Sequence, residues 1–277
     1  MSPSVVASIP AQNTGGQVSE TQTVPKVTFT AKQLEHINKF AENMSAEEII
    51  RWSIMTIPGL YQTTAFGLTG LVTLDIISKL FPDTHPIDLV FVDTLHHFQE
   101  TLDLIERIKV RYPNVKLHIY KPDGCETRED FTKEFGPELW ETNDTFYDYL
   151  VKVEPVQRAY SELNISAVFT GRRKTQGGQR GSIPIIEVVE NGLIKINPLA
   201  NWSFDQVNEY IKKNDVPYNA LLDQGYRSVG DYHSTVPVKD GEDERAGRWK
   251  GKKKTECGIH ETSRFSEFLK NKTATTV

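Results

Sequence analysis

The stretch Ile87-Asp88-Leu89-Val90-Phe91-Val92-Asp93 is a short, mainly apolar run that ends at a carboxylate. Its length and its β-branched and aromatic residues predict a buried strand. Predicted helices and strands alternate on both sides of it, which favours an α/β fold with a mostly parallel central sheet and helices on both faces. Further strands are expected over residues 60–64, 115–120 and 165–170, and helices over residues 71–80 and 97–111.

Three regions of different composition divide the chain. Residues 1–29 are rich in Ser, Thr, Gln, Gly and Pro and are expected to form a disordered leader. Residues 30–216 form the domain with the alternating elements, where Thr30, Ser45 and Ser203 are expected to cap helices. Residues 217–277 are poor in apolar residues and are expected to form a partly ordered or mobile C-terminal tail.

The bulk composition excludes several classes of protein. The 277 residues carry a net charge of -5, so binding to nucleic acid or to an anionic membrane is not expected of the whole chain. Cys125 and Cys257 are the two cysteines, too few for a disulfide-stapled secreted fold or for a metal site made of cysteines alone. No apolar run is long enough to span a membrane, and the first residues do not resemble a signal peptide. The sequence therefore predicts a soluble cytoplasmic protein whose thiols stay reduced.

Two motifs follow predicted strands. Thr63-Thr64-Ala65-Phe66-Gly67-Leu68-Thr69-Gly70 combines short hydroxyl side chains with the start of a helix, which suits a phosphate. The alternative is a plain strand-to-helix turn capped by threonines. Asp93-Thr94 lies at the end of a strand, where Asp93 can accept a hydrogen bond from a ribose or a base. The alternative is that Asp93 caps the next helix.

A third motif is the basic loop from Thr170 to Arg180, which follows another predicted strand. It contains Arg172, Arg173, Lys174, Gln176 and Arg180 among three glycines. Arginine forks bind phosphate or sulfate through two parallel hydrogen bonds. Its place at a strand end favours an anion site over the alternative of a solvated charged loop.

The C-terminal tail combines positive charge with a thiol. Six of the ten residues from Arg245 to Lys254 are basic, and Cys257 follows three residues later. Nearby cations lower the pKa of a thiol and favour the nucleophilic thiolate. His260 can assist the thiol or can be an exposed bystander. A solvated basic run, a nuclear localisation signal or an inert structural cysteine are the alternatives. Cys125 has acidic neighbours, Asp123 and Glu126, which should raise its pKa, so it is expected to be inert.

Together these motifs resemble the phosphoadenylyl-sulfate (PAPS) reductase family, which has the PP-loop adenine-nucleotide hydrolase-like fold. The resemblance covers about residues 45–262, and it is nearest to the fungal, thioredoxin-dependent enzymes of methionine and cysteine synthesis. The segment Lys254-Thr255-Glu256-Cys257-Gly258-Ile259-His260 matches the family signature Glu-Cys-Gly-Leu-His with Ile in place of Leu. Residues 225–235 and 241–249 also match.

The resemblance implies a mechanism and a set of site residues. The Cys257 thiolate attacks the sulfur of PAPS, adenosine 3',5'-bisphosphate leaves, and thioredoxin or glutaredoxin frees sulfite from the S-sulfocysteine. Cys257 and His260 are the implied catalytic residues, and members of the family are commonly homodimers. The implied binding residues are Thr63, Thr64, Gly67 and Thr69 of the turn, Asp93 and Thr94, Arg172, Arg173, Gln176 and Arg180 of the basic loop, and His233, Arg245, Arg248 and Lys252 of the tail.

The resemblance also bears on the donor and on cofactors. The related adenylyl-sulfate (APS) reductases hold a [4Fe–4S] cluster with two cysteine pairs. Tyr147-Asp148, Asp231 and Ser234 stand at those four positions here, so no cluster, no metal and a preference for PAPS over APS are expected. The alternatives are an APS reductase, a non-catalytic nucleotide-binding protein of the same fold, and an ATP-using ligase or sulfurtransferase. The turn at residues 63–70 lacks the Ser-Gly-Gly-x-Asp-Ser pattern of that last class.

Overall fold

A six-stranded sheet forms the centre of the computed structural model, which describes residues 27–84, 86–252, 254, 256, 258–259, 265 and 268. The strand order is β3-β2-β1-β4-β6-β5, and all neighbours are parallel except β5 and β6. The mostly parallel α/β fold expected from the sequence is therefore confirmed. The strands are β1 (Leu60–Thr64), β2 (Leu89–Val92), β3 (Leu117–Tyr120), β4 (Ala167–Phe169), β5 (Ile186–Val188) and β6 (Ile194–Ile196).

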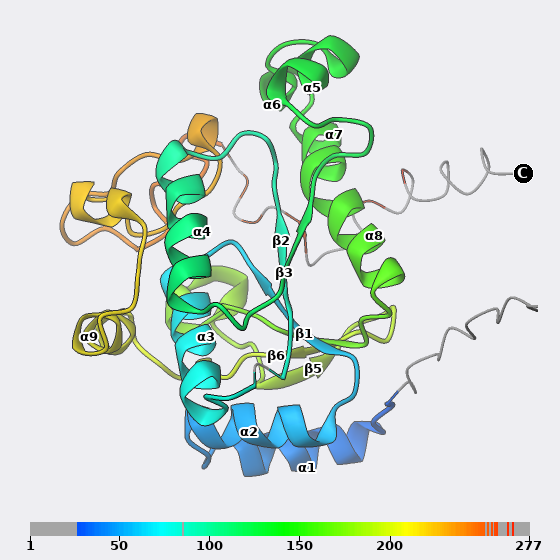
Figure 1. Ribbon diagram of the computed structural model, residues 1–277, viewed down its shortest axis with the longest axis vertical. Helices are drawn as coiled ribbons and strands as arrows, with labels where there is room; N and C mark the ends of the chain where they lie inside the picture. The colour runs from blue at the N-terminus through cyan, green and yellow to red at the C-terminus, as the bar shows by residue number, and fades with distance from the viewer. Residues whose placement is uncertain are drawn as a thin grey trace, which may run out of the picture.

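Helices cover both faces of this sheet (Figure 1). Leu89 and Phe91 of β2 pack into a large core with the helices of one face, whereas Val90 and Val92 pack against α8 on the other. Side chains on a strand alternate between faces, so a continuous apolar run is what a sheet covered on both sides requires. The helices are α1 (Ala31–Ala41), α2 (Ala46–Thr56), α3 (Leu68–Leu80), α4 (Gln99–Arg111), α5 (Arg128–Phe135), α6 (Leu139–Thr142), α7 (Asp144–Asp148), α8 (Glu154–Glu162) and α9 (Phe204–Lys213).

Local sequence signals explain where several helices begin. Thr30, Ser45 and Ser203 each form a capping box with the residue three positions later, as expected from the hydroxyl side chains. The predicted helix from residue 71 begins three residues earlier, at Leu68, directly after Gly67. Strands β5 and β6 and helices α5 to α8 were not predicted from the sequence.

The order of the strands indicates at which edge of the sheet a ligand would bind. The chain runs from β1 outward to β2 and β3 and then returns to β4 on the other side of β1. Ligands of such sheets bind beyond the carboxyl ends of the strands, where the order reverses. Gln62 of β1 is buried and donates to the carbonyl of Gly70 at 2.7 Å, which ties the start of α3 to this edge.

The described part of the C-terminal tail packs on the same edge. Asp231 forms an isolated bridge with His97, and Thr235 forms one with Arg248. Leu221 and Trp249 are buried, so the tail has more fixed contacts than its low apolar content suggested. A domain boundary near residue 217 remains a prediction. No helix among the described residues is long and apolar enough to cross a membrane.

Gly247 is the tightest backbone contact in this tail and yields a stability prediction. A Cβ at Gly247 would lie 2.0 Å from the carbonyl oxygen of Val236, which is backbone and cannot turn away. We expect Gly247→Ala to lower the free energy of unfolding by roughly 1–3 kcal/mol. Gly181→Ala is the matched control, because its Cβ would meet one atom at an ordinary 3.5 Å. Equal thermal melting of wild type and Gly247→Ala would contradict this account.

Candidate active site

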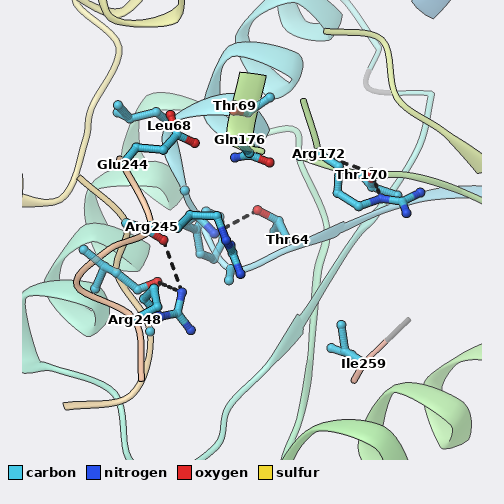
Figure 2. Close-up of a pocket in the computed structure, with 18 of the residues that line it drawn as sticks. Thr64, Leu68, Thr69, Thr170, Arg172, Gln176, Glu244, Arg245, Arg248 and Ile259 are labelled. Atoms are coloured by element: carbon cyan, nitrogen blue, oxygen red, sulfur yellow. Dashed lines mark hydrogen bonds between the residues drawn. The ribbon is translucent and has the colours of Figure 1, made fainter. Parts of the chain in front are cut away.

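One cavity of about 250 Å³ opens at the carboxyl edge of the sheet. Its walls include three segments that are far apart in the sequence, namely the turn at residues 63–70, the basic loop at residues 170–180 and the tail (Figure 2). Arg172 lies on one side of it, and Arg245 and Arg248 of the tail lie on another. The turn, the basic loop and the tail therefore meet in one place. Of the predicted binding residues, the lining contains Thr63, Thr64, Gly67, Thr69, Thr94, Arg172, Arg173, Gln176, Arg180, Arg245 and Arg248.

The turn at residues 63–70 presents the start of α3 to the cavity. Gly67 is the N-cap of α3 and offers no side chain to the first amides of the helix. The helix N-terminus therefore faces the cavity with its partial positive charge, as a phosphate site requires. Thr64 Oγ1 accepts from the amide of Phe66 at 2.9 Å, and Thr69 Oγ1 accepts from Arg173 at 3.0 Å. These hydroxyls shape the turn.

Arg173 is buried, and its guanidinium connects three segments. It donates to Thr69 of the turn, to Thr175 and the Trp202 carbonyl, and to Glu244 of the tail at 2.6 Å. Only 2% of the residue is exposed. A buried arginine satisfied in this way holds the turn and the tail in register as well as adding positive charge to the cavity.

Arg172 and Arg180 each have a carboxylate partner. Arg172 pairs with Glu187 of β5. Arg180 binds Glu256 through two parallel bonds of 2.7 and 2.8 Å, and Arg245 binds the same carboxylate at 3.2 Å. Burial alone would raise the pKa of Glu256, but Arg180, Arg245 and Arg248 outweigh it and lower the pKa. A carboxylate thus occupies an arginine fork of the shape that binds phosphate or sulfate.

The cavity lining has more basic than acidic side chains, although the chain is acidic overall. Three acidic residues line it, namely Asp231, Glu244 and Glu256. Seven basic residues also line it, so the lining has four more basic than acidic side chains, whereas the whole chain has a net charge of -5. Such a field attracts a polyanionic ligand. The seven basic residues are Lys152, Arg172, Arg173, Arg180, Arg227, Arg245 and Arg248.

Three predicted binding residues lie outside the cavity lining. Asp93 accepts from the amide of Leu95 at 2.9 Å, and the helix cap that it was alternatively expected to supply is Phe98 instead. His233 stacks on Trp140 with ring centroids 4.3 Å apart. Lys252 donates to the Trp140 carbonyl and to Glu141. These contacts orient the walls around the site, and direct binding by these residues remains a prediction.

Only one of the two cysteines, Cys125, lies among the residues that the structure describes. Cys257 and His260 lie outside the described residues, whereas Glu256 and Ile259 line the cavity. Cys125 is described and buried. Burial is the largest cause that raises the pKa of its thiol, and the charges of Asp130, Glu134 and Asp123 raise it further. The direction is the one expected from the acidic neighbours in the sequence, but burial contributes more than they do. The Cys125 thiol is thus poorly suited to be a nucleophile.

Sequence reasoning missed several lining residues, among them Lys152, Asn219, Arg227 and Asp231. Asp231 was named only as one of the four positions at which cluster-bearing relatives have cysteine, because a single aspartate has no periodic signal. Among the described residues, no group of three or more His, Cys, Asp or Glu side chains could hold a metal ion.

Comparison with known proteins identifies the family. The family described as "Phosphoadenosine phosphosulfate reductase domain" matches residues 59–237. The chain belongs to this family. It is 60% identical over 249 residues to the phosphoadenosine phosphosulfate reductase of Saccharomyces cerevisiae, covering 88% of this chain and 95% of that protein. It is 56% identical over 253 residues to the one of Emericella nidulans, covering 91% and 83%.

A solved structure of the family has the same architecture. The crystal structure of phosphoadenylyl-sulfate (PAPS) reductase from Candida auris, a phosphate complex, matches with a TM-score of 0.71. It is 54% identical to this chain, and the match covers 76% of this chain and 100% of that one. The resemblance stated from the sequence motifs is therefore confirmed.

Substitution of Arg180 tests whether the cavity of this PAPS reductase family member binds an anion. We expect Arg180→Ala to weaken binding of adenosine 3',5'-bisphosphate by about 1.5–3 kcal/mol, because a charge-assisted contact is lost. Arg173→Ala should act in the same direction. The loss should shrink at high salt, where screening already weakens the contact. Lys174→Ala is the control, because Lys174 belongs to the same loop but pairs with Glu42 outside the cavity. Unchanged affinities for both arginine variants at low salt would favour the solvated-loop alternative.

Proposed function

We propose that this protein reduces PAPS to sulfite and adenosine 3',5'-bisphosphate in sulfate assimilation. The observation that carries the proposal is the convergence at one cavity of a helix N-terminus, seven basic residues, and Glu256 and Ile259, which lie on either side of Cys257 in the sequence. The donor has a phosphosulfate and a 3'-phosphate, so it needs a cavity of this charge. Membership of the PAPS reductase family supports the same activity.

The proposed reaction has three steps that balance in atoms and electrons. The Cys257 thiolate attacks the sulfonate sulfur, an S–S bond forms, and the S–O bond to the phosphate breaks, releasing adenosine 3',5'-bisphosphate. A thiolate of reduced thioredoxin then attacks Sγ of Cys257, and sulfite leaves with the bonding electron pair. The second thioredoxin thiol resolves the mixed disulfide, so thioredoxin becomes oxidised and sulfur is reduced by two electrons.

The cavity residues support the first step through charge. The leaving group is a stabilised phosphate anion, so the step requires no strong general acid. It requires a thiolate and positive groups aimed at the sulfonate and phosphate oxygens. The amides at the start of α3 suit the phosphosulfate, and Arg172, Arg180, Arg245 and Arg248 suit the remaining negative charge. His260 is the candidate to assist the thiol.

The proposal extends to partners and location. Reduced thioredoxin is the proposed co-substrate, with glutaredoxin as the other candidate of the same chemistry. No metal or iron–sulfur cofactor is proposed, because the residues at the four positions used by cluster-bearing relatives are not thiols. A homodimer in the cytoplasm is proposed from the family resemblance, and sedimentation analysis tests the dimer.

A turnover assay separates this function from the alternatives. Purified protein is given PAPS or APS side by side, with thioredoxin and its reductase, and with ATP as a control. Sulfite release from PAPS supports the proposal. Nucleotide binding without sulfite release would indicate a non-catalytic binding protein, and pyrophosphate release from ATP would indicate a ligase or sulfurtransferase.

A further inference from the structure

A buried ionic network lies directly beside the cavity. Lys152 Nζ lies 2.9 Å from Asp148 Oδ1 and 2.7 Å from Asp231 Oδ2. Asp148 and Asp231 are almost fully buried, with 0% and 2% of their surface exposed. Burial by itself would raise the pKa of Asp231, but the Lys152 ammonium is the largest of the charges that outweigh it and lower the pKa, so Asp231 is a carboxylate at neutral pH. One ammonium therefore lies between two buried acidic side chains.

The other polar neighbours on this side contribute hydrogen bonds more than charge. Thr94 donates to Asp231 at 2.6 Å, and the Tyr147 hydroxyl donates to it at 3.4 Å. His233 lies 3.8 Å from Asp231, but burial lowers its pKa to about 3, so the ring is neutral at physiological pH. His97 lies near the same carboxylate, and its Nε2 is 3.1 Å from the Val92 carbonyl.

The second ammonium comes from the C-terminal tail. Lys254 pairs with Asp148 Oδ2, and 7% of its side chain is exposed. Its Nζ also lies 5.4 Å from the centre of the Trp249 ring. With Lys254 in place, two lysines face two carboxylates, so the buried network is balanced in charge. Without it, Lys152 alone would face both acids, and burying the uncompensated charge is strongly unfavourable.

We propose that Lys254 is a positioning residue for the sulfonate-transfer step. It lies three residues before Cys257 in the sequence, and Glu256, one residue before Cys257, is held by Arg180 and Arg245. Two anchors of opposite charge thus hold the described residues that precede the thiol, one in the buried network and one on the cavity wall. The inference rests on the proposed function, because it assumes that Cys257 accepts the sulfonate.

The test compares variants that remove the same charge at two places. Lys254→Met removes the buried ammonium and keeps most of the length of the side chain. Lys250→Met is the matched control, because Lys250 belongs to the same basic run and is exposed. The first measurement is the single-turnover rate of S-sulfocysteine formation from PAPS, followed by intact mass. The second is the dissociation constant for adenosine 3',5'-bisphosphate.

We expect Lys254→Met to slow adduct formation roughly 10- to 100-fold, because small misplacements of a reacting group have effects of that size. The dissociation constant should change by less than about twofold, since a positioning residue does not bind the nucleotide. Lys250→Met should match the wild type in both measurements. A Lys254→Met variant that forms the adduct at the wild-type rate, or that loses nucleotide affinity in proportion to rate, would overturn the proposal.

A second variant separates positioning from simple destabilisation. The double change Asp148→Asn with Lys254→Met leaves Lys152 paired with Asp231 alone, so charge balance is restored. We expect it to melt at a higher temperature than Lys254→Met while adduct formation stays slow. Recovery of the rate together with stability would show that Lys254 acts only on folding.

A third measurement does not depend on the reaction. A glutamate-specific protease should cut after Glu256 several-fold faster in Lys254→Met than in the wild type, because local release exposes the peptide bond. Equal cleavage in both would contradict the anchor even if PAPS is not the substrate. Failure of the wild type to form any adduct, with faster cleavage in Lys254→Met, would instead contradict the proposed function and leave the anchor supported.

Discussion

Cys257→Ser is expected to abolish sulfite release and to leave nucleotide binding almost intact. Removal of a nucleophile lowers turnover by a factor on the order of 10⁶ in a well-studied hydrolase, and a serine hydroxyl is a far weaker nucleophile than a thiolate at neutral pH. The thiolate attacks only during the chemical step, so its loss should not weaken ground-state binding of adenosine 3',5'-bisphosphate. Sulfite release and isothermal titration measure the two effects separately.

The mass of the adduct locates the nucleophile independently. Wild-type protein mixed with PAPS in the absence of thioredoxin should gain one sulfonate, and peptide mapping should place it at Cys257. Cys125→Ser is the control and should keep the activity of the wild type, because Cys125 is buried and the pKa of its thiol is raised. An adduct on Cys125, or full turnover by Cys257→Ser, would overturn the assignment.

A large preference for PAPS over APS is the second expected result. The 3'-phosphate adds roughly -1.5 to -2 charge and three acceptor oxygens, and the cavity has four more basic than acidic residues. Two charge-assisted hydrogen bonds of about 1.5 kcal/mol each would raise kcat/KM roughly 100-fold for PAPS. Steady-state kinetics with both donors and thioredoxin measure the ratio. Equal turnover of the two donors would refute the preference.

The comparison with cluster-bearing relatives that predicts a preference for PAPS also predicts that the protein contains no iron. The structure brings all four positions used by cluster-bearing relatives together. Lys152 bridges Asp148 and Asp231, Tyr147 contacts Asp231, and the Ser234 hydroxyl donates to the Asp231 carbonyl at 3.4 Å. Carboxylates, a phenol and the Ser234 hydroxyl are not the thiolates that an iron–sulfur cluster requires. Anaerobically purified protein should be colourless. Stoichiometric iron and acid-labile sulfide would show that these positions were misinterpreted.

The family motifs were the strongest sequence signal, and the site followed from them in part. Residues 63–70, 170–180 and 245–249 could be singled out because hydroxyls, glycines and arginines cluster there, and the structure joins all three at one cavity. Asp93 was expected from its place at the end of a strand, and His233 and Lys252 from the family resemblance, but all three lie outside the lining. Position along the sequence does not tell toward which side of a loop a side chain points.

The sequence by itself determined those helix starts and strands that depend only on residues a few positions apart. Three helix starts follow from a hydroxyl residue with a partner three positions later, and the buried strand follows from its apolar run. The acidic chain with a basic tail was also evident from composition.

Only the tertiary structure decided how the charges pair. It showed that Arg180 and Arg245 share Glu256, that Arg173 is buried against Glu244, and that Lys254 completes a network with Asp148. These partners are separated by up to about a hundred residues of chain, whereas an ion pair depends on distances of a few ångströms and on burial. Sequence patterns report periodicity and composition, so charge pairing across the fold became visible only when the chain was folded.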